Sequence, residues 1–207
     1  MEVPLFPLRS VHYPGLPVPL HVFEPRYRAL VTRCLEEDST FGTILIVRGP
    51  EVGPGAETAG VGTEVRIVTH QVLHDGRYLV AGLGERRFRI MERLPDAPYP
   101  RAEVEFLREG PVSAEPDKAA TQLNAGIRSY LTLLGIDSSQ LAELEVSTDT
   151  WLAVYQVSAL LRIDWPEKQT LLEAPSVDER LRLVLRLLTR EIALFEHLRR
   201  GGEPGRG

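Results

Sequence analysis

The apolar residues in the first half of the chain come in short runs separated by turn residues, and this pattern predicts a β-rich fold. Between Val61 and Ile67 apolar and polar residues alternate, as in a strand with one buried and one solvated face. Asp75-Gly76 predicts a two-residue hairpin turn with antiparallel pairing, since both central positions of such a turn need positive φ. Seven short strands in a barrel or sandwich are expected. The runs are Leu5–Leu8, Val18–Phe23, Thr43–Val47, Val61–Leu73, Tyr78–Leu83, Phe88–Met91 and Ala102–Leu107.

Proline restricts the beginning of the chain further. Six of the 16 prolines fall within the first 25 residues, and proline cannot donate to a β-ladder. This segment is therefore expected at sheet edges, strand starts and bends. Between Glu24 and Leu35 the spacing becomes helical, with Cys34 on the apolar stripe and Pro25 in the first turn. Residues 48–62 are rich in Gly, Pro and Glu and predict a mobile surface loop.

After about Gly110 the apolar residues follow helical spacing. One stripe covers residues 123–134 and stops at Gly135, a residue suited to the left-handed position that ends a helix. A second stripe covers residues 149–160, and a third follows the capping box Ser176–Glu179. The fold class is therefore predicted to be α+β. The expected parts are a β-barrel lobe at residues 1–110, a helical lobe at 111–200 and a disordered tail at 201–207.

Charge and composition exclude several classes of protein. With 24 basic against 29 acidic residues, the chain lacks the basic surplus of a protein that binds nucleic-acid phosphates. The two lysines, Lys118 and Lys168, do not follow glycine, so no phosphate-binding loop is expected. A single cysteine excludes an internal disulfide. No signal peptide or membrane span is predicted, and we expect a cytoplasmic protein without a membrane partner.

No set of catalytic or metal-binding residues emerges from the spacing. His70 and His74 are four residues apart, but on a strand this separates them by roughly 13 Å, too far for one zinc ion. Cys34 is expected to be a buried packing residue rather than a nucleophile. Glu24 and Arg26 could form a catalytic or ligand-binding pair, but a structural role fits better. Glu24 is expected at a helix N-terminus, where the helix dipole favours a carboxylate, and Arg26 is expected to pair with an acidic group on the barrel and so fix the helix across it. We therefore expect no enzyme activity, no metal and no cofactor.

Three stretches resemble the N-terminal substrate-binding domain of Lon proteases. The first is the Pro-rich start up to Tyr27, the second is the hairpin region at residues 62–88, and the third lies at residues 168–181. The resemblance covers nearly the whole chain in the right order. The motif residues that carry it most clearly are Pro14, Gly15, Phe23, Glu24, Arg26, Tyr27, Lys168, Gln169 and Glu173.

The resemblance implies an antiparallel PUA-like β-barrel followed by a C-terminal helical bundle. It also implies a non-catalytic module for recognition or docking of polypeptides, and a related domain in cereblon is such a docking platform. Its partners would be unfolded or hydrophobic polypeptides, or a protease or other protein complex. The ATPase and protease modules of a full Lon protease are absent from residues 1–207, so a standalone protein is expected. The alternative function is that of an RNA-binding PUA-like module, which the net acidity disfavours.

The peptide-binding surface leaves only a faint trace in the sequence. An exposed apolar patch or an unpaired strand edge near the Pro-rich start would suffice for peptide binding, and the groove between the two lobes is predicted to be the binding surface. Bulky aromatic residues are the candidates for contact with a partner, although each of them could equally be a core residue. These candidates are Tyr13, Tyr99, Trp151 and Trp165.

Overall fold

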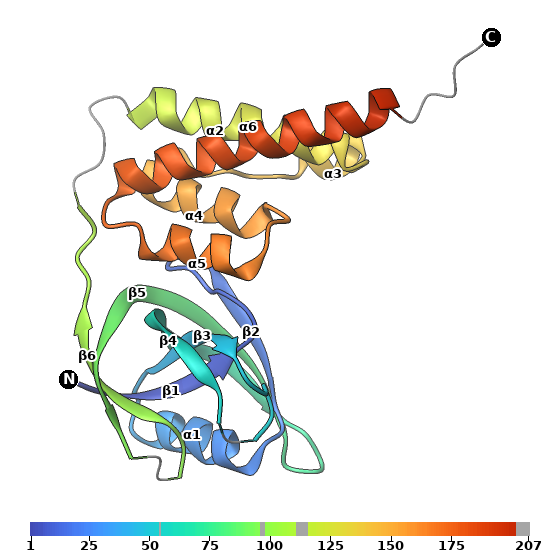
Figure 1. Cartoon of the computed structure of the whole chain (residues 1–207). Coiled ribbons are helices and arrows are strands. Elements are labelled where there is room, and N and C mark those ends of the chain that lie inside the picture. Colours follow the sequence, from blue (N-terminus) through green and yellow to red (C-terminus); the bar gives the residue numbers. More distant parts are fainter. Residues whose placement is uncertain (54, 96–97, 111–115, 202–207) are drawn as a thin grey trace. The chain divides into compact units, whose positions relative to one another are not determined.

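The computed structural model describes residues 1–53, 55–95, 98–110 and 116–201. The chain divides into two compact units (Figure 1). The first comprises Met1–Arg108 together with Ile163–Glu173, and the second comprises Glu109–Arg162 and the residues from Ala174 onward. The tail expected to be disordered lies, from residue 202, outside the described residues.

The first unit is built on a six-stranded sheet with the order β2-β5-β4-β3-β1-β6. Because β5 also pairs with β6, the pairings run round a closed ring of five strands, and β2 continues from β5 as an edge strand. The strands are β1 Glu2–Leu8, β2 Pro17–Val22, β3 Phe41–Arg48, β4 Glu57–Val72, β5 Tyr78–Leu94 and β6 Arg101–Phe106. The α+β class is confirmed, since helices account for much of the remaining chain.

Most strand pairings are antiparallel, as predicted, but three details of the sheet differ from the prediction. The sheet is not wholly antiparallel, because β1 and β3 pair in parallel from Leu5 opposite Gly42 onward. A parallel pair needs a long crossover, which β2 and helix α1 (Pro25–Glu36) supply here. The two runs predicted at residues 78–91 form one long strand, β5, so there are six strands in the described chain rather than seven. The loop predicted at residues 48–62 is shorter, since β4 already begins at Glu57.

The hairpin between β4 and β5 is antiparallel as predicted, with Val72 opposite Tyr78. Its turn differs from the expected two-residue form. The Gly76 N–H donates to the Leu73 carbonyl at 2.8 Å, and Gly76 has a φ of 77° whereas Asp75 is not in the positive region. This is the three-residue connection in which a tight turn is followed by a left-handed glycine.

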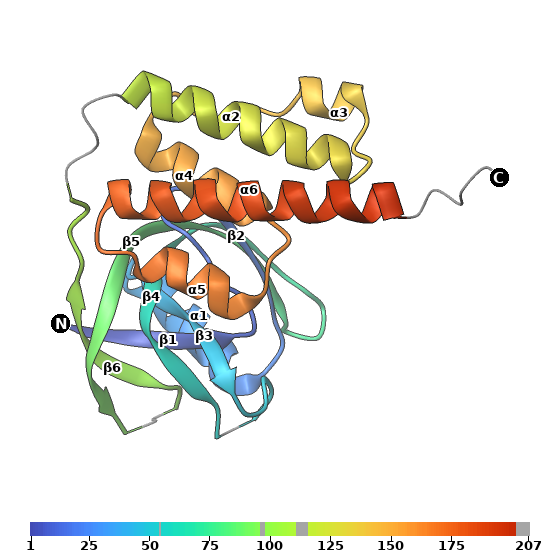
Figure 2. The same cartoon turned by 45° about the horizontal axis from the view of Figure 1, so that its top comes forward.

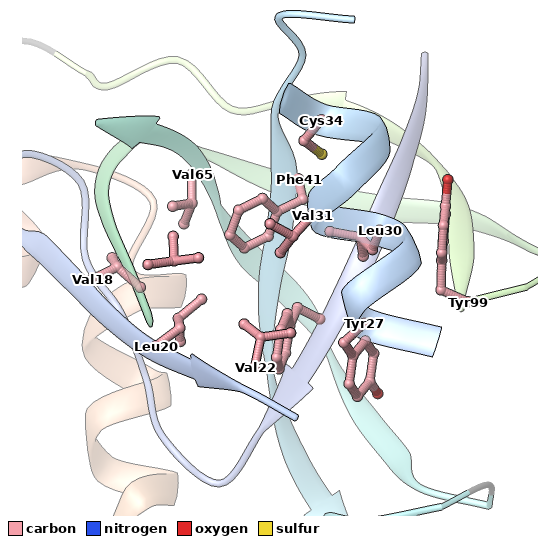
Figure 3. Close-up of a cluster of buried hydrophobic side chains, with 12 residues drawn as sticks. Val18, Leu20, Val22, Tyr27, Leu30, Val31, Cys34, Phe41, Val65 and Tyr99 are labelled. Carbon is pink, nitrogen blue, oxygen red and sulfur yellow. The ribbon is translucent and has the colours of Figure 1, made fainter. Parts of the chain in front are cut away.

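Helix α1 fills the space beside β1, β2 and β3. Its buried residues Tyr27, Leu30, Val31 and Cys34 are the stripe that the sequence predicts. They pack on the inward residues of β2 and on Phe41 (Figure 3). The ring of Tyr27 also stacks on Phe6 with a centroid distance of 4.2 Å.

A second core cluster surrounds Phe88, which is fully buried on β5. The ring of Phe88 lies against the backbones of Gly42 on β3 and Gly62 on β4. A Cβ atom at Gly42 would lie 2.6 Å from the ring, and one at Gly62 would lie 2.5 Å from it. Because these two glycines carry no Cβ atom, the Phe88 side chain can pack against β3 and β4 inside the closed ring of strands.

Helix α5 (Trp165–Glu173) belongs to the unit of the sheet, whereas the sequence placed it in the helical lobe. The Tyr13 hydroxyl donates to the Lys168 carbonyl at 3.0 Å, and the Gln169 amide donates to the Val61 carbonyl at 2.9 Å. Buried Arg87 donates to the Leu172 carbonyl at 2.8 Å. A helical pattern predicts a helix but not its neighbours, and here buried polar groups attach the helix to the strands. Figure 1 shows the strands between α5 and α1, and in Figure 2 α5 lies in front of the strands.

The second unit is helical. Its helices are α2 Pro116–Leu133, α3 Ser138–Ala142, α4 Thr150–Leu160 and α6 Val177–Gly201. The fully buried Arg180 pairs with Glu109 at 3.1 Å, and its guanidinium lies 4.4 Å from the ring centroid of Tyr155. The Ser176 hydroxyl accepts from the Glu179 N–H at 3.2 Å, so the predicted cap at the start of α6 is present. The sequence did not predict the short α3. None of the described helices combines the length and apolar character that a membrane crossing requires.

Candidate functional site

Glu24 and Arg26 at the entry to α1 fix the loop between β3 and β4. One oxygen of Glu24 accepts from the Arg26 side chain at 3.1 Å and from the Gly53 N–H at 3.2 Å. Arg26 also donates to the Gly53 carbonyl at 2.8 Å. Glu24 occupies the N-cap position, but its side chain makes no capping hydrogen bond to the helix. The pair therefore acts on the loop, which it holds by both backbone groups of Gly53.

The loop contributes Glu51 and Val52 to the lining of a pocket of about 240 Å³ beside the start of α1. The stacked rings of Phe6 and Tyr27 contribute to its apolar lining. Phe23 and Val52 are 48% and 58% exposed, so apolar surface continues from the pocket outward. We call this cavity the Phe23 pocket. Its lining residues are Phe6, Pro7, Leu8, His21, Phe23, Glu24, Tyr27, Glu51 and Val52.

A second, open hollow of about 550 Å³ lies on β2 and the β4–β5 hairpin. We call it the hairpin groove. His21 lines both this groove and the Phe23 pocket, and its ring lies 5.9 Å from the ring of Phe23. Leu79 contributes apolar surface here, since its side chain is 42% exposed. The groove is lined by Pro19, Leu20, His21, Thr69, His70, Gln71, Leu79, Val80 and Ala81.

Together the Phe23 pocket and the hairpin groove form one surface, which we call the Phe23 surface. It lies at the Pro-rich start, where an apolar patch or a free strand edge would suffice for peptide binding, whereas the sequence favoured the groove between the two lobes. From the sequence, Phe23 was identified only as a motif residue, and the exposed apolar side chains of Val52 and Leu79 were not predicted to belong to a binding surface. The sequence signal for Phe23 was its position directly after an edge strand that contains two prolines, Pro17 and Pro19.

None of the four aromatic residues predicted to contact a peptide is among the residues that line the two hollows. Tyr13 and Tyr99 are 2% and 3% exposed, and both use their hydroxyls in internal hydrogen bonds. They are core residues, which is the alternative that the sequence left open. Trp151 is half-buried on α4 with its ring edge-on to Tyr155. Trp165 is 45% exposed on α5, and contact of either tryptophan with a partner stays a prediction.

The remaining motif residues hold the first unit together. Gly15 has a φ of 76° and donates its N–H to the Gly84 carbonyl at 2.8 Å, next to the buried Pro14. Gln169 donates to Glu173 at 2.8 Å as well as to β4. Lys168 is almost buried, its ammonium lies 5.7 Å from the Trp165 ring, and burial lowers its pKa.

The described residues offer little for covalent or metal chemistry. Burial raises the pKa of the Cys34 thiol, which keeps it in the unreactive protonated form. Across the part of the chain that the structure describes, no three His, Cys, Asp or Glu side chains gather in a way that could hold a metal ion. What the Phe23 surface can offer a ligand is exposed apolar area beside carboxylates.

Comparison with known proteins places this fold among previously described ones. The sequence model of one family, described as "ATP-dependent protease La (LON) substrate-binding domain", matches residues 2–190. Lon protease 2 of Myxococcus xanthus is 30% identical over 194 residues, which cover 91% of this chain and 24% of that protein. A LON peptidase N-terminal domain and RING finger protein of Schizosaccharomyces pombe is 25% identical, with coverage of 90% of this chain and 45% of that protein. The chain thus spans about a quarter of the length of the Lon proteases that it matches.

Two solved structures share the fold. The Lon N-terminal domain protein from Xanthomonas campestris has a TM-score of 0.68 at 28% identity, with coverage of 90% of this chain and 98% of that one. The N-terminal domain of the Mycobacterium avium complex Lon protease has the same TM-score at 18% identity, with coverage of 91% and 98%. The second similarity concerns the fold alone.

Proposed function

The chain belongs to the family of ATP-dependent protease La (LON) substrate-binding domains, and we propose that it recognises polypeptides through the Phe23 surface. The observation that carries this proposal is the exposure of apolar side chains, Phe23, Val52 and Leu79, around two adjoining hollows. Exposed apolar surface of this kind is typical of a protein–protein contact. The partners are unfolded or hydrophobic polypeptides, bound without a chemical step. We also assign the closed ring of strands to the PUA-like barrels that the sequence resemblance implies.

The mode of binding follows from the sequence of β2. An extended peptide adds to a sheet edge through backbone hydrogen bonds and therefore needs N–H groups on that edge. β2 is an edge strand, but Pro17 and Pro19 have no backbone N–H to donate to an added strand. Prolines on an edge strand therefore hinder the addition of another strand. The proposed ligand consequently binds by inserting side chains into the Phe23 pocket and hairpin groove, with few backbone bonds to β2.

A titration with an unfolded protein tests the proposal. Binding of a fluorescently labelled, permanently unfolded test protein is expected at micromolar or weaker affinity. Phe23→Ser and Leu79→Ser should each weaken it at least about five-fold, as expected when an exposed apolar anchor is removed. Met91→Ser is the matched control, because Met91 is 64% exposed on the same unit but lines neither hollow.

Two results would contradict the proposal. One is the absence of a response from the wild-type protein at tens of micromolar. The other is an equal loss of affinity in all three variants, which would show that binding depends on general surface hydrophobicity rather than on the Phe23 surface.

A further inference from the structure

The Phe23 pocket contains a carboxylate that forms no ion pair with any described residue. Its two lining carboxylates are Glu24 and Glu51. The charge of Glu24 is matched by Arg26 at 3.1 Å. Glu51 accepts only from the backbone N–H of Arg9, at 3.0 Å, while the Arg9 guanidinium donates to the Gly49 carbonyl. Among the described residues, therefore, the exposed Glu51 makes no ion pair.

The size and lining of the pocket limit what can enter it. Its volume of about 240 Å³ is below the roughly 300–1,000 Å³ of sites that enclose a small organic ligand. It is large enough for one bulky side chain. The stacked rings of Phe6 and Tyr27, together with Pro7 and Leu8, favour an aromatic or aliphatic group. Glu51 and Val52 both line the pocket, so a side chain that enters it meets apolar surface and a nearby acidic residue.

We propose that the Phe23 pocket selects a bulky apolar side chain that is flanked in the polypeptide by lysine or arginine. The apolar side chain enters the pocket, and the neighbouring cation pairs with Glu51 at the rim. This inference rests on the proposed function and specifies its substrate class as segments of mixed apolar and basic sequence. Segments with acidic flanks are disfavoured, because a second carboxylate beside Glu51 repels it.

The expected size of this preference is modest. An ion pair exposed to solvent changes affinity by roughly two- to five-fold at low salt, and the effect weakens as salt screens the charges. The apolar insertion provides most of the affinity, and Glu51 provides discrimination between flanking residues.

Three labelled peptides of equal length provide the test by fluorescence anisotropy. Each carries the same central phenylalanine, with flanking residues that are lysine, serine or glutamate. The wild-type protein should bind them in the order lysine, serine, glutamate at about 0.02 M salt, with smaller differences at about 0.3 M. Glu51→Gln should bring the three affinities together, since the amide retains the acceptor for Arg9 but not the charge. Glu36→Gln is the matched control, because Glu36 is an exposed carboxylate near the other end of α1.

The outcomes separate this inference from the proposed function. Equal affinities for all three peptides in the wild-type protein, or an order that persists in Glu51→Gln, would overturn the charge preference and leave polypeptide recognition standing. Failure of every peptide and of the unfolded test protein to bind would overturn both. Equal affinities in the wild-type series overturn the charge preference even where a variant folds poorly, whereas an ordered series assigns the preference to Glu51 only when Glu51→Gln removes the order.

Discussion

Replacing Gly62 by alanine should destabilise the first unit, although the change adds only one methyl group. The new Cβ would lie 2.5 Å from Cζ of Phe88 and would also meet the backbone carbonyl of Thr43 on β3. Overpacking of this kind costs about 1–3 kcal/mol. Gly60 on the same strand is the matched control, because nothing lies within 4 Å of a Cβ placed there. Gly60→Ala should be neutral or stabilising by up to about 1 kcal/mol, since it removes the excess flexibility of glycine.

Urea unfolding measured through Trp165 gives the comparison directly. Trp165 belongs to the first unit and Trp151 to the second, so a Trp151→Phe background makes fluorescence specific for the unit of the sheet. In this background Gly62→Ala should be about 1–3 kcal/mol less stable than Gly60→Ala. Equal stabilities would refute the argument that Phe88 and the β3 backbone fill this space.

A double substitution identifies the clashing group. At Gly42 the nearest neighbours of a new Cβ are atoms of Phe88 and Leu5 side chains, with no backbone atom among them. The cost of Gly42→Ala should therefore shrink in a Phe88→Leu background, because a smaller side chain relieves the contact. A cost that stays the same in both backgrounds would contradict the assigned contact.

Three further measurements test other parts of the structure. Burial lowers the pKa of His12 to about 4, so between pH 6.5 and 4 the unfolded chain binds a proton at His12 and the folded chain does not. The free energy of unfolding should therefore fall by up to about 3 kcal/mol over this range, and His12→Gln should remove this part of the pH dependence. Cys34 should not react with a thiol reagent at pH 7–8 until urea unfolds the protein, and rapid labelling of the native state would show that its burial is wrong. Gln169→Leu should cost about 1–3 kcal/mol in the Trp165 assay by leaving the Val61 carbonyl without this donor, whereas Gln122→Leu at an exposed position of α2 should change it little.

Local features of the fold could be predicted from the sequence because they depend on neighbouring residues. The stripe of α1, the antiparallel hairpin and the cap at Ser176 are all encoded within a few positions. The parallel pairing of β1 with β3 and the ring closure between β5 and β6 depend on segments far apart in the chain. The position of α5 depends likewise on buried polar contacts that no periodicity reveals, such as the hydrogen bond from Gln169 to Val61.

The candidate surface was harder to predict than the fold. Selecting aromatic residues by type led to Tyr13 and Tyr99, whose hydroxyls have partners within the core. A sequence does not show whether a tyrosine hydroxyl finds such a partner, and this decides between core and surface. Phe23 differs because it directly follows the edge strand β2 and precedes the entry to α1, where the chain leaves the sheet.

The motif at the start of α1 links the fold to the proposed binding surface. Glu24 and Arg26 were interpreted as structural residues, with Arg26 paired to an acidic group on the barrel. In the structure Arg26 pairs with Glu24 instead, and both contact Gly53. The structure they stabilise, however, is the loop that carries Glu51 and Val52 into the lining of the Phe23 pocket. Structural and functional readings of this motif are therefore not alternatives. By holding this loop, the ion pair determines which apolar and charged groups the pocket presents to a polypeptide.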